Sequence, residues 1–114
     1  MNNDFEIEIS SDMIFAVEKL LHNVYNPVYT LSNNAKLLRS IGFELVNKFE
    51  NLKDKLIKKV NLLDTKKKKK VKLKYYELFA LHEIIKDLIS LSQNGYDHHQ
   101  LQTVLNLLNK KLQS

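Results

Sequence analysis

Two stretches of the chain repeat one pattern of apolar and polar residues, 64 positions apart. Residues 7–21 (IEISSDMIFAVEKLL) align without a gap on residues 71–85 (VKLKYYELFALHEII). One unit of this size cannot bury its apolar face alone, whereas two copies can close on each other about a pseudo-two-fold axis. We therefore expect copy one at residues 5–49, a helical extension and lysine-rich linker at 50–70, and copy two at 71–112.

Each copy opens with alternating apolar and polar residues, which is the pattern of a strand with one buried face. A pseudo-two-fold axis would pair the two strands antiparallel. Two registers keep equivalent residues opposed: Glu8 with Lys72 and Glu6 with Lys74, or Ile7 with Val71, Glu6 with Lys72 and Glu8 with Lys70. Both registers place glutamates opposite lysines, and such pairs are stabilising. The sequence therefore predicts a two-stranded ribbon within one molecule.

Apolar residues spaced by three and four positions predict four helices. The first begins at Ser10 or Ser11, and the second runs from about residue 33 toward residue 63, continuously or with a break near Asn51. A third helix follows the second strand, and the last is expected to begin at Asp97, which resembles the start of a capping box. The 114 residues suit a single domain. The predicted fold is mainly α, a bundle of four helices with a two-stranded antiparallel ribbon.

The composition excludes several functional classes. The chain has no cysteine, which rules out disulfides and thiolate chemistry. It contains no apolar run long enough to span a membrane and no secretory signal, so we expect a cytoplasmic protein without a membrane partner. No phosphate-binding loop or nucleophile motif is present. The spacing of the four histidines does not suit a metal, and His22 and His82 lie on polar helix faces, where a surface position is the ordinary explanation. We expect no enzyme activity, no cofactor, no metal and no small-molecule substrate.

The net charge of +5 comes from one basic tract, since the five lysines 66–70 account for all of it. Such a tract is either a solvated linker, the interpretation we favour, or a contact to phosphate. The candidate nucleic-acid contacts are Lys66, Lys67, Lys68, Lys69, Lys70, Lys72 and Lys74. Tyr75, at an inward strand position, and Tyr76, at the start of the third helix, either stack on bases or pack at the edge of the core. Packing is the favoured interpretation.

The strand-helix-helix order, found twice over residues 5–49 and 71–112, resembles in topology the ribbon-helix-helix DNA-binding proteins. In that family two chains pair their strands and insert the ribbon into the major groove. Lys72 and Lys74 match the role that the resemblance implies for the ribbon. Glu6 and Glu8 do not, because carboxylates repel phosphate, and the chain is not assigned to the family.

The second helix carries apolar residues beyond the end of the repeat, more than the shorter last helix can cover. The candidate partner surface consists of Leu45, Phe49, Leu52, Leu56 and Leu63. We therefore expect a small non-catalytic interaction or regulatory module that binds a protein partner or forms a homo-oligomer through this helix. The alternative is a nucleic-acid-binding protein that uses the lysine tract on a ribbon-helix-helix-like scaffold.

Overall fold

Four α-helices and one two-stranded sheet make up the computed structural model, which describes residues 4–25, 33–58, 67–92 and 94–113. The elements are β1 (Asp4–Ser10), α1 (Ser11–Leu21), the 3-10 helix η1 (His22–Tyr25), α2 (Asn33–Lys58), β2 (Lys68–Lys74), α3 (Tyr75–Leu88), the 3-10 helix η3 (Ile89–Leu91) and α4 (Gly95–Gln113). The prediction of a mainly α protein with a small antiparallel ribbon is confirmed. Within the described residues, no helix combines the length and apolarity needed to cross a membrane.

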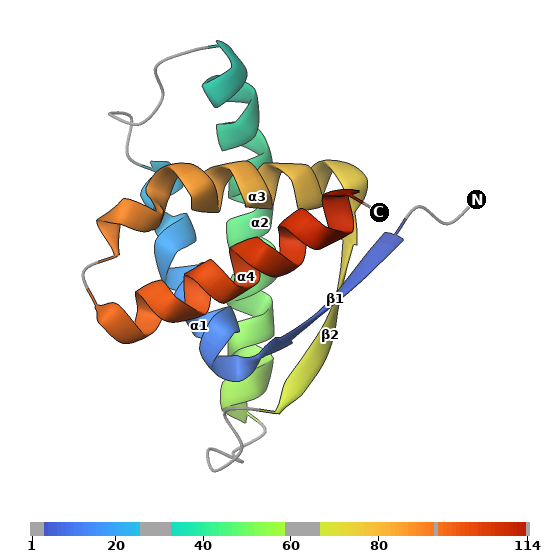
Figure 1. Ribbon diagram of the computed structural model, residues 1–114, viewed down its shortest axis with the longest axis vertical. Helices are drawn as coiled ribbons and strands as arrows, with labels where there is room; N and C mark the ends of the chain where they lie inside the picture. Colours follow the sequence, from blue (N-terminus) through green and yellow to red (C-terminus); the bar gives the residue numbers. More distant parts are fainter. Residues whose placement is uncertain (1–3, 26–32, 59–66, 93, 114) are drawn as a thin grey trace.

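The ribbon pairs β1 with β2 antiparallel, with Ile7 opposite Val71 (Figure 1). Glu6 lies opposite Lys72 and Glu8 opposite Lys70, so the second of the two expected registers is the one adopted. In the middle of the ribbon the inward residues Ile7, Ile9, Val71 and Leu73 are buried, and the outward residues Glu6, Glu8, Lys70 and Lys72 are exposed. This alternation follows from the two-residue period of a strand, which points successive side chains to opposite faces.

Helices α1 and α3 begin directly after the two strands. The Ser10 hydroxyl accepts a hydrogen bond from the Met13 backbone N–H at 3.3 Å, which caps α1 as expected. At α3 the Glu77 carboxylate accepts a hydrogen bond from the Lys74 backbone N–H at 2.9 Å, which is the contact that the glutamate makes in a capping box. Each cap fixes the direction in which the chain leaves the ribbon.

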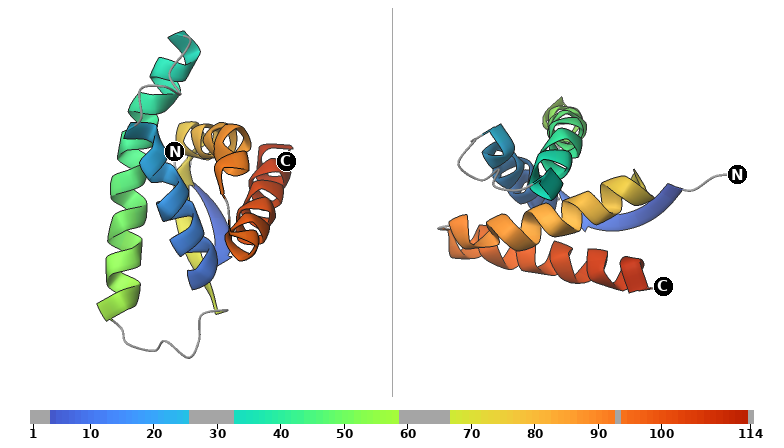
Figure 2. Two further views of the ribbon diagram at one scale, coloured as in Figure 1. Left: turned by 90° about the vertical axis from the view of Figure 1, so that its left-hand side faces the viewer. Right: turned by 90° about the horizontal axis from the view of Figure 1, so that it is seen from above.

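The helices pack in pairs on the inner face of the ribbon. Figure 1 shows the long α2 behind, with α3 and α4 crossing in front of it. In Figure 2, α1 lies beside α2, and α4 lies beside α3. Helix α1 also packs on α4, and α3 also packs on α2, so α1 and α3 each contact both α2 and α4. The single core lies between these four helices and the ribbon.

The two aligned stretches have matching structures. Strand β1 covers residues 4–10 and β2 covers residues 68–74, and α1 and α3 begin at residues 11 and 75, all 64 positions apart. Their apolar positions are buried alike, in the pairs Ile7 and Val71, Ile9 and Leu73, Ile14 and Leu78, Ala16 and Ala80, Val17 and Leu81, Leu20 and Ile84, and Leu21 and Ile85. The match holds for these apolar pairs and not for every position, since Ser11 is buried while Tyr75, 64 positions later, is exposed.

The structure decides one open alternative and corrects two expectations. Helix α2 is continuous from Asn33 to Lys58, without a break near Asn51. Helix α4 begins at Gly95 rather than Asp97, because the Asn94 side-chain oxygen accepts from the Tyr96 N–H at 2.8 Å and supplies the cap. The lysine tract is not a linker from residue 68 onward, since residues 68–70 belong to β2.

Candidate interaction surface

The apolar residues of α2 serve mainly the protein's own core. Leu45 and Phe49, both expected on a partner surface, are fully buried at 0% exposure. Leu52 and Leu56 are partly buried and pack against the same core, and Leu63 lies outside the described residues. The reason is that α1 and α3 both pack on α2 and cover its apolar stripe. In the described part of α2, Ile57 is the large apolar residue left exposed, at 52%.

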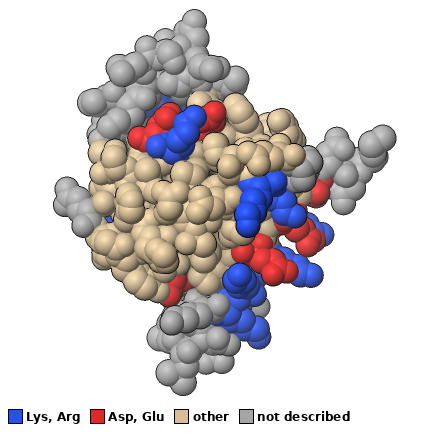
Figure 3. All heavy atoms as spheres, viewed as in Figure 1, with Lys and Arg blue, Asp and Glu red and all other residues tan. Residues whose placement is uncertain are grey.

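The basic tract is partly neutralised by the ribbon. Lysines 67, 68, 70, 72 and 74 are exposed and Lys69 is partly buried, while Lys66 lies outside the described residues. Asp4, Glu6 and Glu8 lie opposite Lys74, Lys72 and Lys70, so acids and lysines alternate on the outward face. Figure 3 shows charges of both signs gathered on the ribbon side of the molecule. The lysine tract therefore does not form a uniformly positive surface once the two strands are paired.

Three aromatic side chains at the start of α3 are exposed: Tyr75 at 56%, Tyr76 at 44% and Phe79 at 43%. We call these three residues the α3 aromatic patch. They lie within one helical turn, where residues three and four apart are neighbours. The expectation that both tyrosines pack in the core is wrong. Tyr75 is the first residue of α3 rather than an inward strand residue, and its ring lies 6.0 Å from the Phe5 ring.

Beyond this patch, which directly follows Lys74 of the ribbon, the surface of α3 and α4 differs in charge from the ribbon side. In Figure 3 most of the described surface over α3 and α4 shows neither Lys, Arg, Asp nor Glu. An ion pair on α3 joins Lys86 Nζ and Glu83 Oε2 at 2.6 Å, and this hydrogen bond raises the pKa of Lys86. A surface poor in charge is inexpensive to desolvate, which favours contact with another protein.

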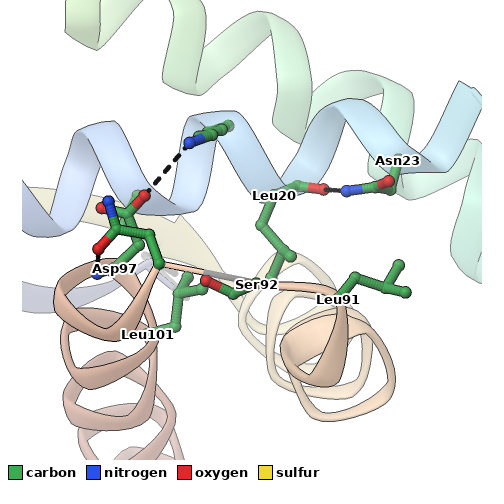
Figure 4. A pocket seen from close by; sticks show the side chains of 9 residues that line it. Leu20, Asn23, Leu91, Ser92, Asp97 and Leu101 are labelled. Carbon is green, nitrogen blue, oxygen red and sulfur yellow. Dashed lines mark hydrogen bonds and ion pairs between the residues drawn. The ribbon is translucent and has the colours of Figure 1, made fainter.

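A pocket of about 260 Å³ lies between α1, η3 and the start of α4 (Figure 4). Ala16, Leu20 and Leu101 supply its apolar wall. Its polar residues are paired: Lys19 Nζ lies 3.4 Å from Asp97 Oδ2, and the Asn23 amide donates to the Leu20 carbonyl at 2.9 Å. The Lys19–Asp97 pair joins α1 to α4, and both pairs use groups that a polar ligand would need.

A second polar contact also joins these helices. The Tyr96 hydroxyl donates a hydrogen bond to the Asp12 carboxylate, linking the starts of α4 and α1. This bond raises the pKa of Tyr96, because a neighbouring carboxylate favours the protonated phenol. Tyr96 therefore keeps its proton, and this link, through the neutral pH range.

A cluster of titratable side chains joins the end of α1 to the middle of α2. His22 Nε2 lies 2.7 Å from Glu18 Oε1 and 3.2 Å from Glu50 Oε1. The Lys53 ammonium lies 3.3 Å from the other oxygen of Glu18, whose side chain is only 9% exposed. From the sequence, His22 was placed on a polar helix face without these partners. The spacing of Glu18 and His22 was visible in the sequence, whereas the approach of Glu50 depends on how α1 packs on α2.

No family model matches the chain, and neither the curated proteins nor the solved structures contain a significant match to it.

Proposed function

We propose that the protein is a non-catalytic interaction module that binds a protein partner through the α3 aromatic patch. The observation that carries the proposal is the exposure of three adjacent aromatic side chains on a helix whose other large apolar residues are buried. Aromatic residues are enriched in the anchor positions of protein interfaces, where they bring large apolar area at low entropic cost. The neighbouring surface of α3 and α4 supports the proposal because it carries little charge.

The proposed surface replaces the one expected from the sequence. Leu45 and Phe49 are unavailable to a partner while the domain is folded, because they lie in its core. The class of function stays the same, and the contact moves from α2 to α3. Self-association through the patch is the second form of the proposal, and sedimentation velocity over a range of concentrations distinguishes it from binding of a foreign protein.

Replacing Phe79 with Asp is expected to reduce partner binding about thirtyfold or more, since the loss of an anchor residue typically costs about 2 kcal/mol or more. The measurement is cross-linking and affinity capture in the native host, followed by titration of the captured protein with purified variants. The matched control is Ile57→Asp, which places the same charge at an equally exposed apolar residue on α2.

Both variants should melt close to the original protein, because both positions are exposed. A captured protein that binds Phe79→Asp as tightly as the original chain would contradict the proposal. So would an equal loss of binding in Ile57→Asp, because the effect would then not be specific to the patch.

We also infer that the chain is a duplicated β-α-α unit with pseudo-two-fold symmetry. The two strands and the starts of α1 and α3 match at an offset of 64 residues, and so does the burial of their apolar residues, which supports this inference. The ribbon register supports it as well, because an axis through the Ile7 and Val71 pair would exchange the Glu6–Lys72 and Glu8–Lys70 pairs. A duplicated unit explains why a chain of this length closes one core from two similar halves.

A nucleic-acid-binding function is the alternative, and one specific observation favours it. Exposed Lys72 and Lys74 directly precede the exposed Tyr75 and Tyr76, an arrangement that suits a single strand whose bases stack on aromatic rings. The acidic residues opposite these lysines weaken the attraction to phosphate.

If this alternative holds, single-stranded DNA or RNA should bind at about 50 mM salt and lose affinity steeply by about 200 mM. A gel-shift titration measures both conditions, and Lys72→Ala with Lys74→Ala should weaken binding and flatten the salt dependence. The absence of any shifted band at the lower salt concentration would reject the alternative.

A further inference from the structure

We propose that Glu18, His22 and Glu50 form a binding site for one divalent transition-metal cation, of the zinc or nickel class. The site lies where the end of α1 meets α2, away from the residues of the α3 aromatic patch, and does not depend on the proposed function. Each of the three residues contributes one ligand atom, and these atoms all lie within 4.8 Å of one another.

The distances suit a small cation. Zinc is held by imidazole nitrogen at about 2.0–2.1 Å and by carboxylate oxygen at about 2.0–2.2 Å, in a roughly tetrahedral arrangement. Ligand atoms around such an ion are therefore a little over 3 Å apart. His22 Nε2 already lies 2.7 Å and 3.2 Å from the two glutamate oxygens, so rotations of the side chains are sufficient to admit the ion.

The contacts of His22 Nε2 with the two glutamates show where the cation would bind. Ionised carboxylates only accept hydrogen bonds, so a hydrogen bond from His22 to Glu18 uses a proton on Nε2. A metal ion takes the place of that proton and is held by the same atoms, because metal binding requires the unprotonated nitrogen. One nitrogen and two oxygens leave a fourth position for water, as in open zinc sites.

The helices hold the ligands without long loops. Glu18 and His22 are four residues apart and therefore project from the same face of one helical segment. Glu50 comes from α2, which packs along α1. Lys53 binds the second oxygen of the buried Glu18 and thereby orients its carboxylate, as hydrogen-bonded partners of metal ligands commonly do. Counting Lys53 and the two glutamates, the group keeps one net negative charge to attract a cation.

Burial is graded across the site in a way that allows access. The Glu18 side chain is nearly buried, whereas those of His22 and Glu50 are partly exposed, at 44% and 42%. The cation can therefore approach from solvent on the side of His22 and Glu50. Glutamate and histidine, rather than glutamate alone, favour zinc or nickel over magnesium or calcium, which prefer oxygen ligands only.

Isothermal titration calorimetry of the full chain with zinc chloride, and separately with nickel chloride, tests the proposal. We expect saturable binding of one ion per chain that EDTA reverses. His22→Ala and Glu50→Gln should each weaken the affinity at least about tenfold, since even the loss of a partner of a ligand costs 10- to 100-fold. Saturating zinc should also raise the melting temperature of the original chain and not that of His22→Ala.

The controls are His82→Ala, on α3, and the double variant His98→Ala with His99→Ala, on α4. These variants should keep the original affinity, because these histidines do not belong to the cluster. The proposal is overturned if neither metal gives saturable binding up to about 1 mM of the free ion. It is also overturned if His22→Ala and Glu50→Gln bind as the original chain does, or if binding disappears in the His98 and His99 variant instead.

Discussion

Replacing Phe49 with alanine is expected to lower the free energy of unfolding by about 3–5 kcal/mol, because it removes a large buried side chain and leaves a cavity. Phe49 is at 0% exposure and heads the largest fully buried side chains of the domain. It lies on α2, against which α1 and α3 both pack, so the gap can close only if these helices shift toward one another. A domain of this size is stable by only about 5–15 kcal/mol, so the loss is a large fraction of the total.

Urea titration followed by far-ultraviolet circular dichroism measures this change, and the slope of the transition should stay the same. Phe79→Ala is the matched control, because the same substitution at an exposed position should cost about 0.5 kcal/mol or less. Equal effects of the two substitutions would mean that Phe49 is not a core residue. The long second helix would then again be a candidate partner surface.

The sequence was sufficient to predict the ribbon and the helices that follow it. Alternation in β1 and β2 identifies the buried face, and the charges opposite one another restrict the register to two choices. The choice of Ile7 opposite Val71 was not determined, since both registers pair glutamates with lysines. Distinguishing them requires the geometry of the packed helices, which no local pattern contains.

The function of the apolar residues on α2 could not be predicted from the same kind of pattern. An apolar stripe predicts that one helix face is buried, and it does not say whether the covering surface belongs to the same chain. Leu45 and Phe49 are covered by the protein's own helices. The exposed aromatic patch was missed for a related reason, because Tyr75 begins α3 where a strand residue was expected. Because α3 begins one residue earlier than expected, Tyr75 is exposed rather than buried.

Side-chain contacts between separate helices could not be predicted from the sequence. Glu18 and His22 are four residues apart, and their pairing follows from the helical period alone. Glu50 is separated from them by residues 23–49, and only the packing of α1 on α2 brings its carboxylate to His22. From the sequence we considered the spacing of the histidines, whereas the residues that His22 contacts in the fold are Glu18 and Glu50.

Reversing the charges on one strand of the ribbon is the second change that we expect to lower the stability of the protein strongly. Replacing Glu6 and Glu8 together with lysine should lower the free energy of unfolding by about 1–3 kcal/mol. Opposite charges facing each other across two strands contribute about 0.2–1 kcal/mol per pair, and like charges cost a similar amount, so each reversal changes the balance twice. Lys72 and Lys70 face these positions in the observed register. Because the outward face is exposed, the loss should shrink as salt is added.

A charge exchange separates this electrostatic effect from a loss of strand propensity. Lys70→Glu and Lys72→Glu, combined with the two lysine substitutions, restore opposite charges in the same register and should recover most of the lost stability. Chemical denaturation of the original chain, the double variant and the fourfold variant, at low and high salt, measures the coupling. An unchanged midpoint in the double variant would show that the facing charges do not stabilise the ribbon. A fourfold variant as unstable as the double variant would show that the destabilisation comes from the substituted residues themselves rather than from the pairs that they form.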